Sequence, residues 1–130
     1  METRLKLIAF DLDYTLWPFR LDTDVVAPFQ KRSNGNIVDS KGTKLNCYHE
    51  VPGILKSLDE DGFILAIVSR IAKTKAARQL LEIIGWDSFF SFKEIYPGHK
   101  SLHFQRIKDQ SKIDYHEMLF FDDEHLLTIL

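Results

Sequence analysis

Two carboxylates separated by one residue follow the first apolar segment of the chain. Asp11 and Asp13 come directly after residues 5–10, which are almost continuously apolar. In a displacement at phosphorus, one such carboxylate can attack while its neighbour protonates the leaving oxygen and then deprotonates a water. The spacing therefore indicates phosphoryl transfer to Asp11, giving an aspartyl-phosphate, with Asp13 as the general acid and base.

Further polar side chains follow two later apolar segments and one turn-like segment. They are Ser69 and Arg70 after residues 63–68, Asp122 and Asp123 after residues 118–121, and Lys100 at the end of residues 96–100. In one shared crevice the carboxylates would repel without a cation, and a ligand set made only of oxygen suits Mg²⁺. We therefore expect Mg²⁺ and Lys100 to neutralise phosphoryl oxygens, and Ser69 to donate a hydrogen bond to another.

The elements that must bring these residues together are predicted by the pattern of apolar residues. Residues 5–10, 63–68 and 118–121 have the composition of strands buried on both faces of a parallel sheet. The same patterns predict helices at residues 52–61, at 75–84 with Thr74 as a possible N-cap, and at 101–108, and a further strand at residues 89–92. The alternation predicts an α/β fold with right-handed crossovers, in which ligands bind at the carboxyl ends of the strands.

One connection is too long for a simple loop. Residues 14–50 precede the first predicted helix and contain two turn signals, at 33–36 and 40–43, on either side of Ile37 and Val38. We expect a small β-hairpin flap at about residues 20–48, inserted after the first strand. Residues 1–130 otherwise form one domain.

Composition excludes several classes of function. A net charge of -2 gives no electrostatic argument for nucleic acid or for an anionic membrane surface. No segment approaches the roughly 20 apolar residues of a membrane span. The single cysteine, Cys47, cannot form an internal disulfide, so we expect a cytoplasmic protein in a reducing compartment.

The four polar clusters together resemble a known set of motifs. Residues 7–15 are similar to the first motif of the haloacid dehalogenase superfamily, residues 68–69 to the second, Lys100 to the third and residues 120–123 to the acidic fourth. A closer resemblance, to the eukaryotic magnesium-dependent phosphatase family, comes from residues 10–19, 94–98 and 120–124. It extends over almost the whole chain, from Leu5 to Glu124.

The resemblance implies a Rossmann-like parallel sheet with flanking helices and a Mg²⁺-dependent phosphatase. It implies a phosphorylated substrate, either a protein carrying phosphotyrosine or a small molecule such as a sugar phosphate. By the same resemblance, Asp11 is the nucleophile, Asp13 the acid and base, and Asp11, the Asp13 main chain and Asp123 the metal ligands. The substrate phosphate would contact the Leu12 backbone, Ser69, Arg70 and Lys100.

The sequence departs from the resemblance in two places. Arg20, a candidate substrate-binding residue, stands in the flap where the family has an aromatic residue, so we expect a substrate contact there to be changed or lost. The chain also ends at Leu130, seven residues after Asp123, so we expect the family's C-terminal strand and helices to be missing, as in a splice variant or truncated product. That would leave the strand at 118–121 with an unpaired edge and exposed apolar surface. The alternative function is a catalytically silent chain that retains the motifs.

Several individual roles stay open on sequence grounds. Asp122 can orient Lys100 or bind the metal, and Ser69 can be a turn residue. Trp17 and Phe19 can pack under the flap or form an aromatic wall for a flat substrate. His99 and His103 have a spacing that suits a metal, but no third ligand is evident, so we expect both at the surface.

Overall fold

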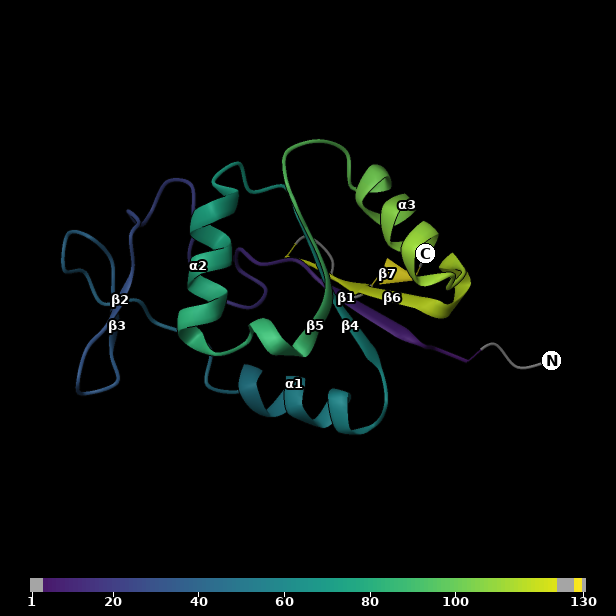
Figure 1. Cartoon of the computed structure of the whole chain (residues 1–130), viewed down its shortest axis with the longest axis horizontal. Coiled ribbons are helices and arrows are strands. Elements are labelled where there is room, and N and C mark those ends of the chain that lie inside the picture. The colour runs from purple at the N-terminus through teal and green to yellow at the C-terminus, as the bar shows by residue number, and fades with distance from the viewer. Residues whose placement is uncertain (1–3, 124–127, 130) are drawn as a thin grey trace.

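The computed structural model describes residues 4–123 and 128–129, which form a five-stranded sheet with helices on both faces (Figure 1). The strand order is β5-β4-β1-β6-β7. The elements are β1 (Leu7–Phe10), β2 (Gln30–Lys31), β3 (Ile37–Val38), α1 (Val51–Glu60), β4 (Ile64–Ser69), α2 (Thr74–Ile84), the 3₁₀ turn η1 (Asp87–Phe89), β5 (Phe90–Ile95), α3 (Lys100–Ser111), the 3₁₀ turn η2 (Tyr115–Glu117), β6 (Met118–Phe121) and β7 (Thr128–Ile129). The predicted α/β class is confirmed.

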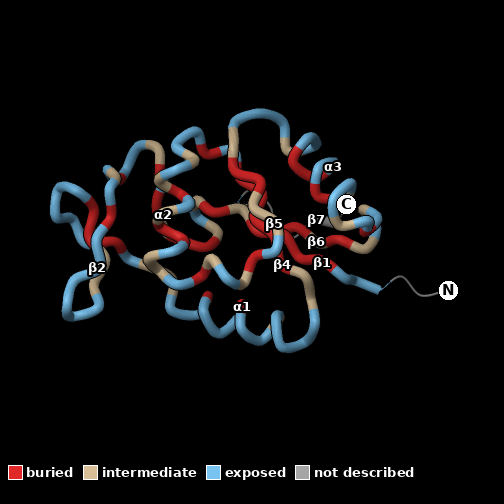
Figure 2. Tube along the Cα trace, in the orientation of Figure 1, coloured by how far each residue is buried: buried red, intermediate tan, exposed pale blue. Residues whose placement is uncertain are grey.

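The central strands are buried on both faces because their alternate side chains enter two separate cores. Ile8 and Phe10 of β1 pack with α1 and α2, while Leu7 and Ala9 pack with Phe104 of α3 and its neighbours. All four residues of β1 are buried, which explains why its sequence has no polar alternation. The burial-coloured trace shows the same buried centre with exposed outer turns of the helices (Figure 2).

The register of the parallel strands aligns the positions that carry chemistry. Phe10 pairs with Ile67 of β4 and with Phe121 of β6. The next residue, Asp11, donates its backbone N–H to the Phe121 carbonyl at 3.0 Å. Consequently Asp11, Ser69 and Asp122 all lie at the same edge of the sheet, as the predicted topology requires.

The outer edge of β6 is paired, so the predicted unpaired edge is wrong. Leu119 and Phe120 pair antiparallel with Ile129 and Thr128 of β7. Sequence periodicity did not reveal the short strand β7, because two residues are too few to show an alternating pattern. Exposed apolar surface is found on the α1 side of β6, where a cavity of ≈ 570 Å³ is lined by Leu58, Phe63, Leu119 and Phe121, among others.

The insertion after β1 contains the predicted hairpin. Strands β2 and β3 pair antiparallel, Gln30 with Val38 and Lys31 with Ile37. The hairpin lies beyond α2 in Figure 1, and the Gln79 side chain of α2 accepts the Phe29 backbone N–H at 3.0 Å. The hairpin is therefore attached to α2, and β2 and β3 do not line the cavity at the strand ends that is described below.

The helices begin and end close to their predicted bounds, with two differences. Thr74 is the first residue of α2 and not its N-cap, since its hydroxyl donates to the Ile95 carbonyl at 2.9 Å. Strand β5 continues to Ile95, beyond the predicted residue 92. Over the part of the chain that the structure describes, no helix has the length and apolar character needed to cross a membrane.

Asp39 organises the second turn of the insertion. Its carboxylate accepts the backbone N–H groups of Val26 at 3.1 Å and of Lys41 and Thr43 at 3.0 Å each. Burial raises the pKa of this carboxyl, but the three backbone donors outweigh burial and hold the pKa below its ordinary value.

We expect the substitution Asp39→Asn to lower the melting temperature at neutral pH, because an amide offers one acceptor oxygen where the carboxylate offers two. The folded-state pKa is lowered, so ionised Asp39 stabilises the fold above the unfolded-state pKa of about 3.9. That stabilisation is lost as the pH falls through the folded-state pKa. The difference in melting temperature between the two proteins should therefore shrink as the pH falls from neutral to below about 3.9. A difference that stays constant over this range would contradict this role.

Candidate active site

A cavity of ≈ 340 Å³ lies at the carboxyl ends of the central strands. Its lining residues are Asp11, Asp13, Tyr14, Arg20, Asp22, Ser69, Arg70, Ile71, Lys100 and Asp123. The structure thus gathers most of the predicted site residues around one space, although they come from segments up to 112 positions apart, from Asp11 to Asp123.

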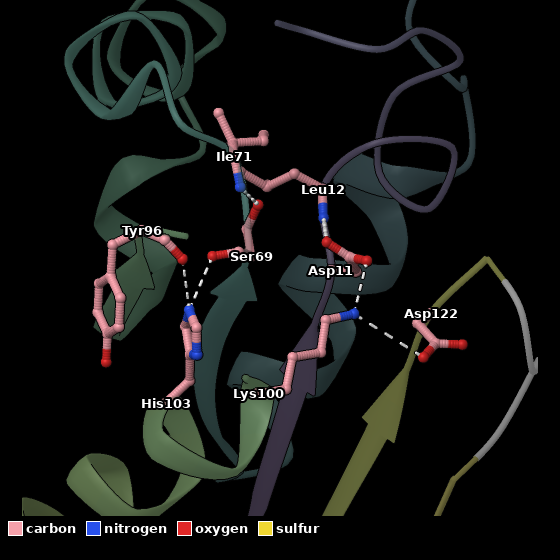
Figure 3. A network of polar contacts seen from close by, with 8 residues as sticks. All are labelled: Asp11, Leu12, Ser69, Ile71, Tyr96, Lys100, His103 and Asp122. Carbon is pink, nitrogen blue, oxygen red and sulfur yellow. Dashed lines mark hydrogen bonds and ion pairs between the residues drawn. The ribbon is translucent and has the colours of Figure 1, made fainter. Parts of the chain in front are cut away.

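Both carboxylate oxygens of Asp11 have partners (Figure 3). Oδ1 accepts the Leu12 N–H at 2.8 Å, and Oδ2 accepts a hydrogen bond from Lys100 Nζ at 3.0 Å. Burial raises the pKa of Asp11 above its ordinary value, although Lys100 and the Leu12 N–H act to lower it. The carboxylate is therefore held in one orientation, at the position that the sequence predicts for a nucleophile.

The Leu12 backbone N–H, which we expect to contact the substrate phosphate, already has a partner within the chain. The Leu12 side chain is fully buried, and the N–H is used by Asp11 Oδ1. That N–H can contact a substrate phosphate only if it leaves Asp11 or is shared with it. Its predicted phosphate contact stays a prediction.

Asp13 is oriented by the turn that follows it. Its Oδ1 accepts hydrogen bonds from the Trp17 indole N–H at 2.8 Å and from the Leu21 backbone N–H at 3.1 Å. Burial raises the pKa of Asp13, while these two donors act to lower it. Because Oδ1 is occupied by donors, a proton on this carboxyl belongs on Oδ2.

The turn at residues 12–17 is tight, and it brings the Trp17 indole within hydrogen-bond distance of Asp13. The N–H groups of Thr15 and Leu16 both point to the Leu12 carbonyl, at 3.0 and 2.9 Å. Tyr14 adopts a left-handed conformation with φ 57°, which is uncommon for an aromatic residue and is concentrated at functional sites. Trp17 is fully buried and stacks on Phe19 with ring centroids 5.4 Å apart, so it packs beneath the site and is not a wall for a flat substrate.

Lys100 is the first residue of α3 and contacts three groups at the sheet edge. Its Nζ lies 3.0 Å from Asp11 Oδ2, 4.0 Å from Asp122 Oδ2 and 4.8 Å from the centre of the Phe120 ring. Asp123, in contrast, lines the cavity and its charge contributes to raising the pKa of Asp11. This geometry favours Asp122 as the residue that orients Lys100 and Asp123 as the residue that faces a ligand.

The loop after β4 contributes a hydroxyl and a cation. Ser69 is buried, and its Oγ accepts the Ile71 N–H at 3.2 Å, which leaves the hydroxyl proton available to a ligand (Figure 3). Arg70 is exposed at the cavity. Arg20 is also exposed there, with its guanidinium 5.9 Å from the centre of the Tyr14 ring.

Asp22 belongs to the site although no sequence motif identified it. Its two carboxylate oxygens accept the backbone N–H groups of Ala72 and Lys73, each at 3.0 Å, and Lys73 Nζ donates to its carbonyl at 2.9 Å. These bonds join the insertion to the residues just before α2, so they fix the C-terminal end of the loop that carries Ser69 and Arg70. Nothing in the sequence around Asp22 indicates that its carboxylate contacts backbone groups 50 positions away.

The expectation of two surface histidines is half right. His99 is exposed, but His103 is fully buried in α3 beneath the strand ends. A histidine in the first turn of a helix gives no indication of burial when the apolar stripe of that helix is as incomplete as in α3.

The donor atoms of the cavity suit a hard divalent cation. Asp11, Asp13 and Asp123 offer only oxygen, and no histidine or cysteine among the described residues lines the cavity. Among the described residues, three such side-chain atoms within 4.8 Å of one another occur only in Asp114, His116 and Glu117. That exposed cluster is accounted for by the capping box of η2 and by the ion pair of Glu117 with Lys6. A cation in the cavity would therefore need a backbone oxygen or further ligands besides the three carboxylates.

Known proteins with similar sequences are named as phosphatases or as HAD-like hydrolases. Residues 4–126 match the family described as Acid Phosphatase. Human magnesium-dependent phosphatase 1 is 46% identical over 119 residues, which cover 92% of this chain and 68% of the human protein. A HAD-like hydrolase superfamily protein of Schizosaccharomyces pombe is 40% identical over 130 residues, covering 92% of this chain and 76% of the yeast protein.

The fold is shared with a solved bacterial structure. A phosphatase domain from Bacteroides fragilis, solved in complex with Mg, superposes with a TM-score of 0.66 at 19% sequence identity. The match covers 92% of this chain and 31% of the bacterial chain. The chain therefore spans only part of this protein, as it does of the human one.

We expect the substitution Asp22→Ala to loosen the loop after β4, because it removes the acceptor of two backbone N–H groups. Breaking hydrogen bonds to a charged acceptor costs about 1.5–3 kcal/mol, so amide hydrogen exchange at Ala72 and Lys73 should accelerate by about tenfold or more. Asp24→Ala, an acidic residue two positions away with no contact to this loop among the described residues, is the matched control. Equal exchange rates in the two variants would contradict the role of Asp22.

Proposed function

The chain belongs to the Acid Phosphatase family of HAD-like hydrolases, and on this basis we propose that it is a Mg²⁺-dependent phosphatase acting through an aspartyl-phosphate on Asp11. The observation that carries the mechanism is the carboxylate of Asp11, held at both oxygens at the end of β1 and facing a cavity that also contains Lys100, Ser69 and Asp13. This arrangement supplies a nucleophile, charge neutralisation and a proton donor around one phosphoryl group.

In the first step, an oxygen of Asp11 forms a bond to phosphorus and the bond from phosphorus to the ester oxygen breaks. Asp13 transfers the proton of its Oδ2 to the departing oxygen and becomes ionised. Lys100 and the Ser69 hydroxyl stabilise the negative charge of the phosphoryl oxygens. The raised pKa of Asp13 is consistent with a carboxyl that starts the reaction protonated.

In the second step, Asp13 takes a proton from a water molecule, and the water oxygen forms a bond to phosphorus. The bond between phosphorus and Asp11 breaks, and inorganic phosphate leaves. Asp11 is again a carboxylate and Asp13 again carries a proton, so the cycle closes without another reactant.

Mg²⁺ fits this cavity through its oxygen donors. We propose the carboxylates of Asp11 and Asp123 and the main chain of Asp13 as its protein ligands, which meets the need for a backbone oxygen. Burial raises the pKa of Asp11 because it disfavours the charged form, and a divalent cation would offset that cost. When bound, Mg²⁺ supplies a Lewis acid that neutralises phosphoryl charge.

The mouth of the cavity favours a substrate larger than phosphate itself. Tyr14 is 43% exposed and lies beside the exposed Arg20 at the lining of the cavity. The hairpin lies on α2, so among the described residues no second domain covers the strand ends. We therefore infer a phosphorylated protein side chain, such as phosphotyrosine, or a sugar phosphate as the substrate class, with Arg70 and Arg20 contacting its anionic groups.

We expect the substitution Asp11→Asn to reduce turnover of p-nitrophenyl phosphate by about a thousandfold or more, because the amide cannot attack phosphorus. Removing divalent cations with EDTA should abolish turnover, and Mg²⁺ should restore it. A melting curve of each protein checks that it is folded. A folded wild-type chain without turnover would instead favour the silent alternative that the sequence leaves open.

We expect the effect of Asp13→Asn to depend on the leaving group. Phenolate needs a proton to depart more than p-nitrophenolate does, so loss of a general acid should slow phenyl phosphate more than p-nitrophenyl phosphate, within the range of about 10²- to 10⁴-fold. Single-turnover rates with the two esters make this comparison. Equal losses with both would exclude proton donation by Asp13 in the first step.

A further inference from the structure

His103 is a buried side chain to which the mechanism assigns no role. It lies on α3, three residues after Lys100, and has 0% exposure. Its ring stacks on that of Tyr96 with centroids 4.1 Å apart and an angle of 11° between the planes. Figure 3 shows the ring between the end of β4 and the first turn of α3.

Each ring nitrogen of His103 faces backbone carbonyl oxygens. Nδ1 lies 2.9 Å from the His99 carbonyl, and Nε2 lies 3.0 Å from the Ser69 carbonyl and 2.8 Å from the Tyr96 carbonyl. A carbonyl oxygen only accepts hydrogen bonds, so a ring nitrogen that binds one has to carry a proton. Hydrogen bonds from both nitrogens at the same time would require the doubly protonated, cationic ring.

A buried cation needs compensation for its lost hydration. Three carbonyl dipoles and the face of the Tyr96 ring surround this one. Tyr96 in turn donates its hydroxyl proton to Glu94 at 3.0 Å, and Glu94 accepts from Arg106 Nε at 2.7 Å. The ring therefore lies against a polar network of Tyr96, Glu94 and Arg106 behind the phosphate site.

The three carbonyls belong to the segments that carry the phosphate-binding groups. Ser69 supplies the hydroxyl at the end of β4, Tyr96 follows the end of β5, and His99 directly precedes Lys100. The Tyr96 N–H also donates to the Ser69 carbonyl at 3.1 Å, so the two strand ends are joined there as well. His103 is thus the side chain that joins the start of α3 to both strand ends.

We propose that His103 is a positioning residue, a buried imidazolium that holds Lys100 at a set place relative to Ser69 and adds positive charge behind the phosphate. The catalytic consequence rests on the proposed phosphatase function, whereas the protonation of the ring and its effect on phosphate binding do not. The ring does not line the cavity, so it acts through Ser69 and Lys100 and not on the substrate.

The first test is the protonation state of the ring in the wild-type chain. Nitrogen NMR of protein labelled with ¹⁵N-histidine should show both ring nitrogens of His103 protonated near neutral pH, with the signals assigned by their loss in His103→Gln. A signal from an unprotonated ring nitrogen at this residue would overturn the imidazolium.

The second test compares His103→Leu and His103→Gln, with His116→Gln, an exposed histidine in η2, as the matched control. Leucine cannot donate, so the KM for p-nitrophenyl phosphate and the inhibition constant of inorganic phosphate should rise about tenfold, with a smaller change in kcat. Glutamine can donate to the same carbonyls and should recover part of this loss. If His103 were purely structural, both variants would have a lower melting temperature, but KM measured at temperatures where they are folded would be that of the wild type. That result would overturn the positioning role.

Failure of this proposal is distinguishable from failure of the phosphatase function. If the wild-type chain turns over the ester and all three variants have the wild-type KM, His103 has no positioning role and the function stands. If the wild-type chain has no turnover, calorimetric binding of inorganic phosphate to wild type, His103→Gln and His103→Leu gives the comparison in place of KM. Weaker binding in the leucine variant than in the glutamine variant supports positioning, and equal binding in all three overturns it.

Discussion

The ion pair between Lys100 and Asp11 is the contact on which the arrangement of the site depends. It joins two residues 89 positions apart at 3.0 Å, and it forms only because the order β5-β4-β1 brings the start of α3 to the end of β1. The pair is partly buried, so the attraction is stronger than it would be in water, while the loss of hydration raises the pKa of Asp11. A carboxylate in this state is held in place and needs a cationic partner, which are the properties that a phosphoryl acceptor requires.

The insertion after β1 has two parts with different relations to the site. Its first residues return to Asp13, through the Trp17 indole and the Leu21 N–H, and reach α2 through Asp22. The hairpin that follows is attached to the side of α2 and is organised by its own turn around Asp39. Changes in the hairpin therefore need not move the carboxylates, because the groups that hold Asp11 and Asp13 lie outside β2 and β3.

Much of the fold could be predicted because its strands are buried on both faces. A run such as residues 7–10 has no other common explanation when a polar residue ends it and a helical pattern follows. The length of β5, the strand β7 and the first residue of α2 were not predictable to the same degree. Each depends on a partner elsewhere, as the Thr74 hydroxyl does on the Ile95 carbonyl.

Residue types and spacing along the chain were enough to predict the kind of chemistry: the polar residues that end the strands, the one-residue spacing of Asp11 and Asp13, and the oxygen ligands that suit Mg²⁺. The contacts that these residues make became visible only in the folded chain. The fold places Asp122 toward Lys100 and Asp123 toward the cavity, joins Asp22 to the loop after β4, and buries His103 among three carbonyls. The physical reason is that spacing along the chain sets geometry within one segment, whereas these roles depend on distances between segments that only packing of the sheet and its helices brings together.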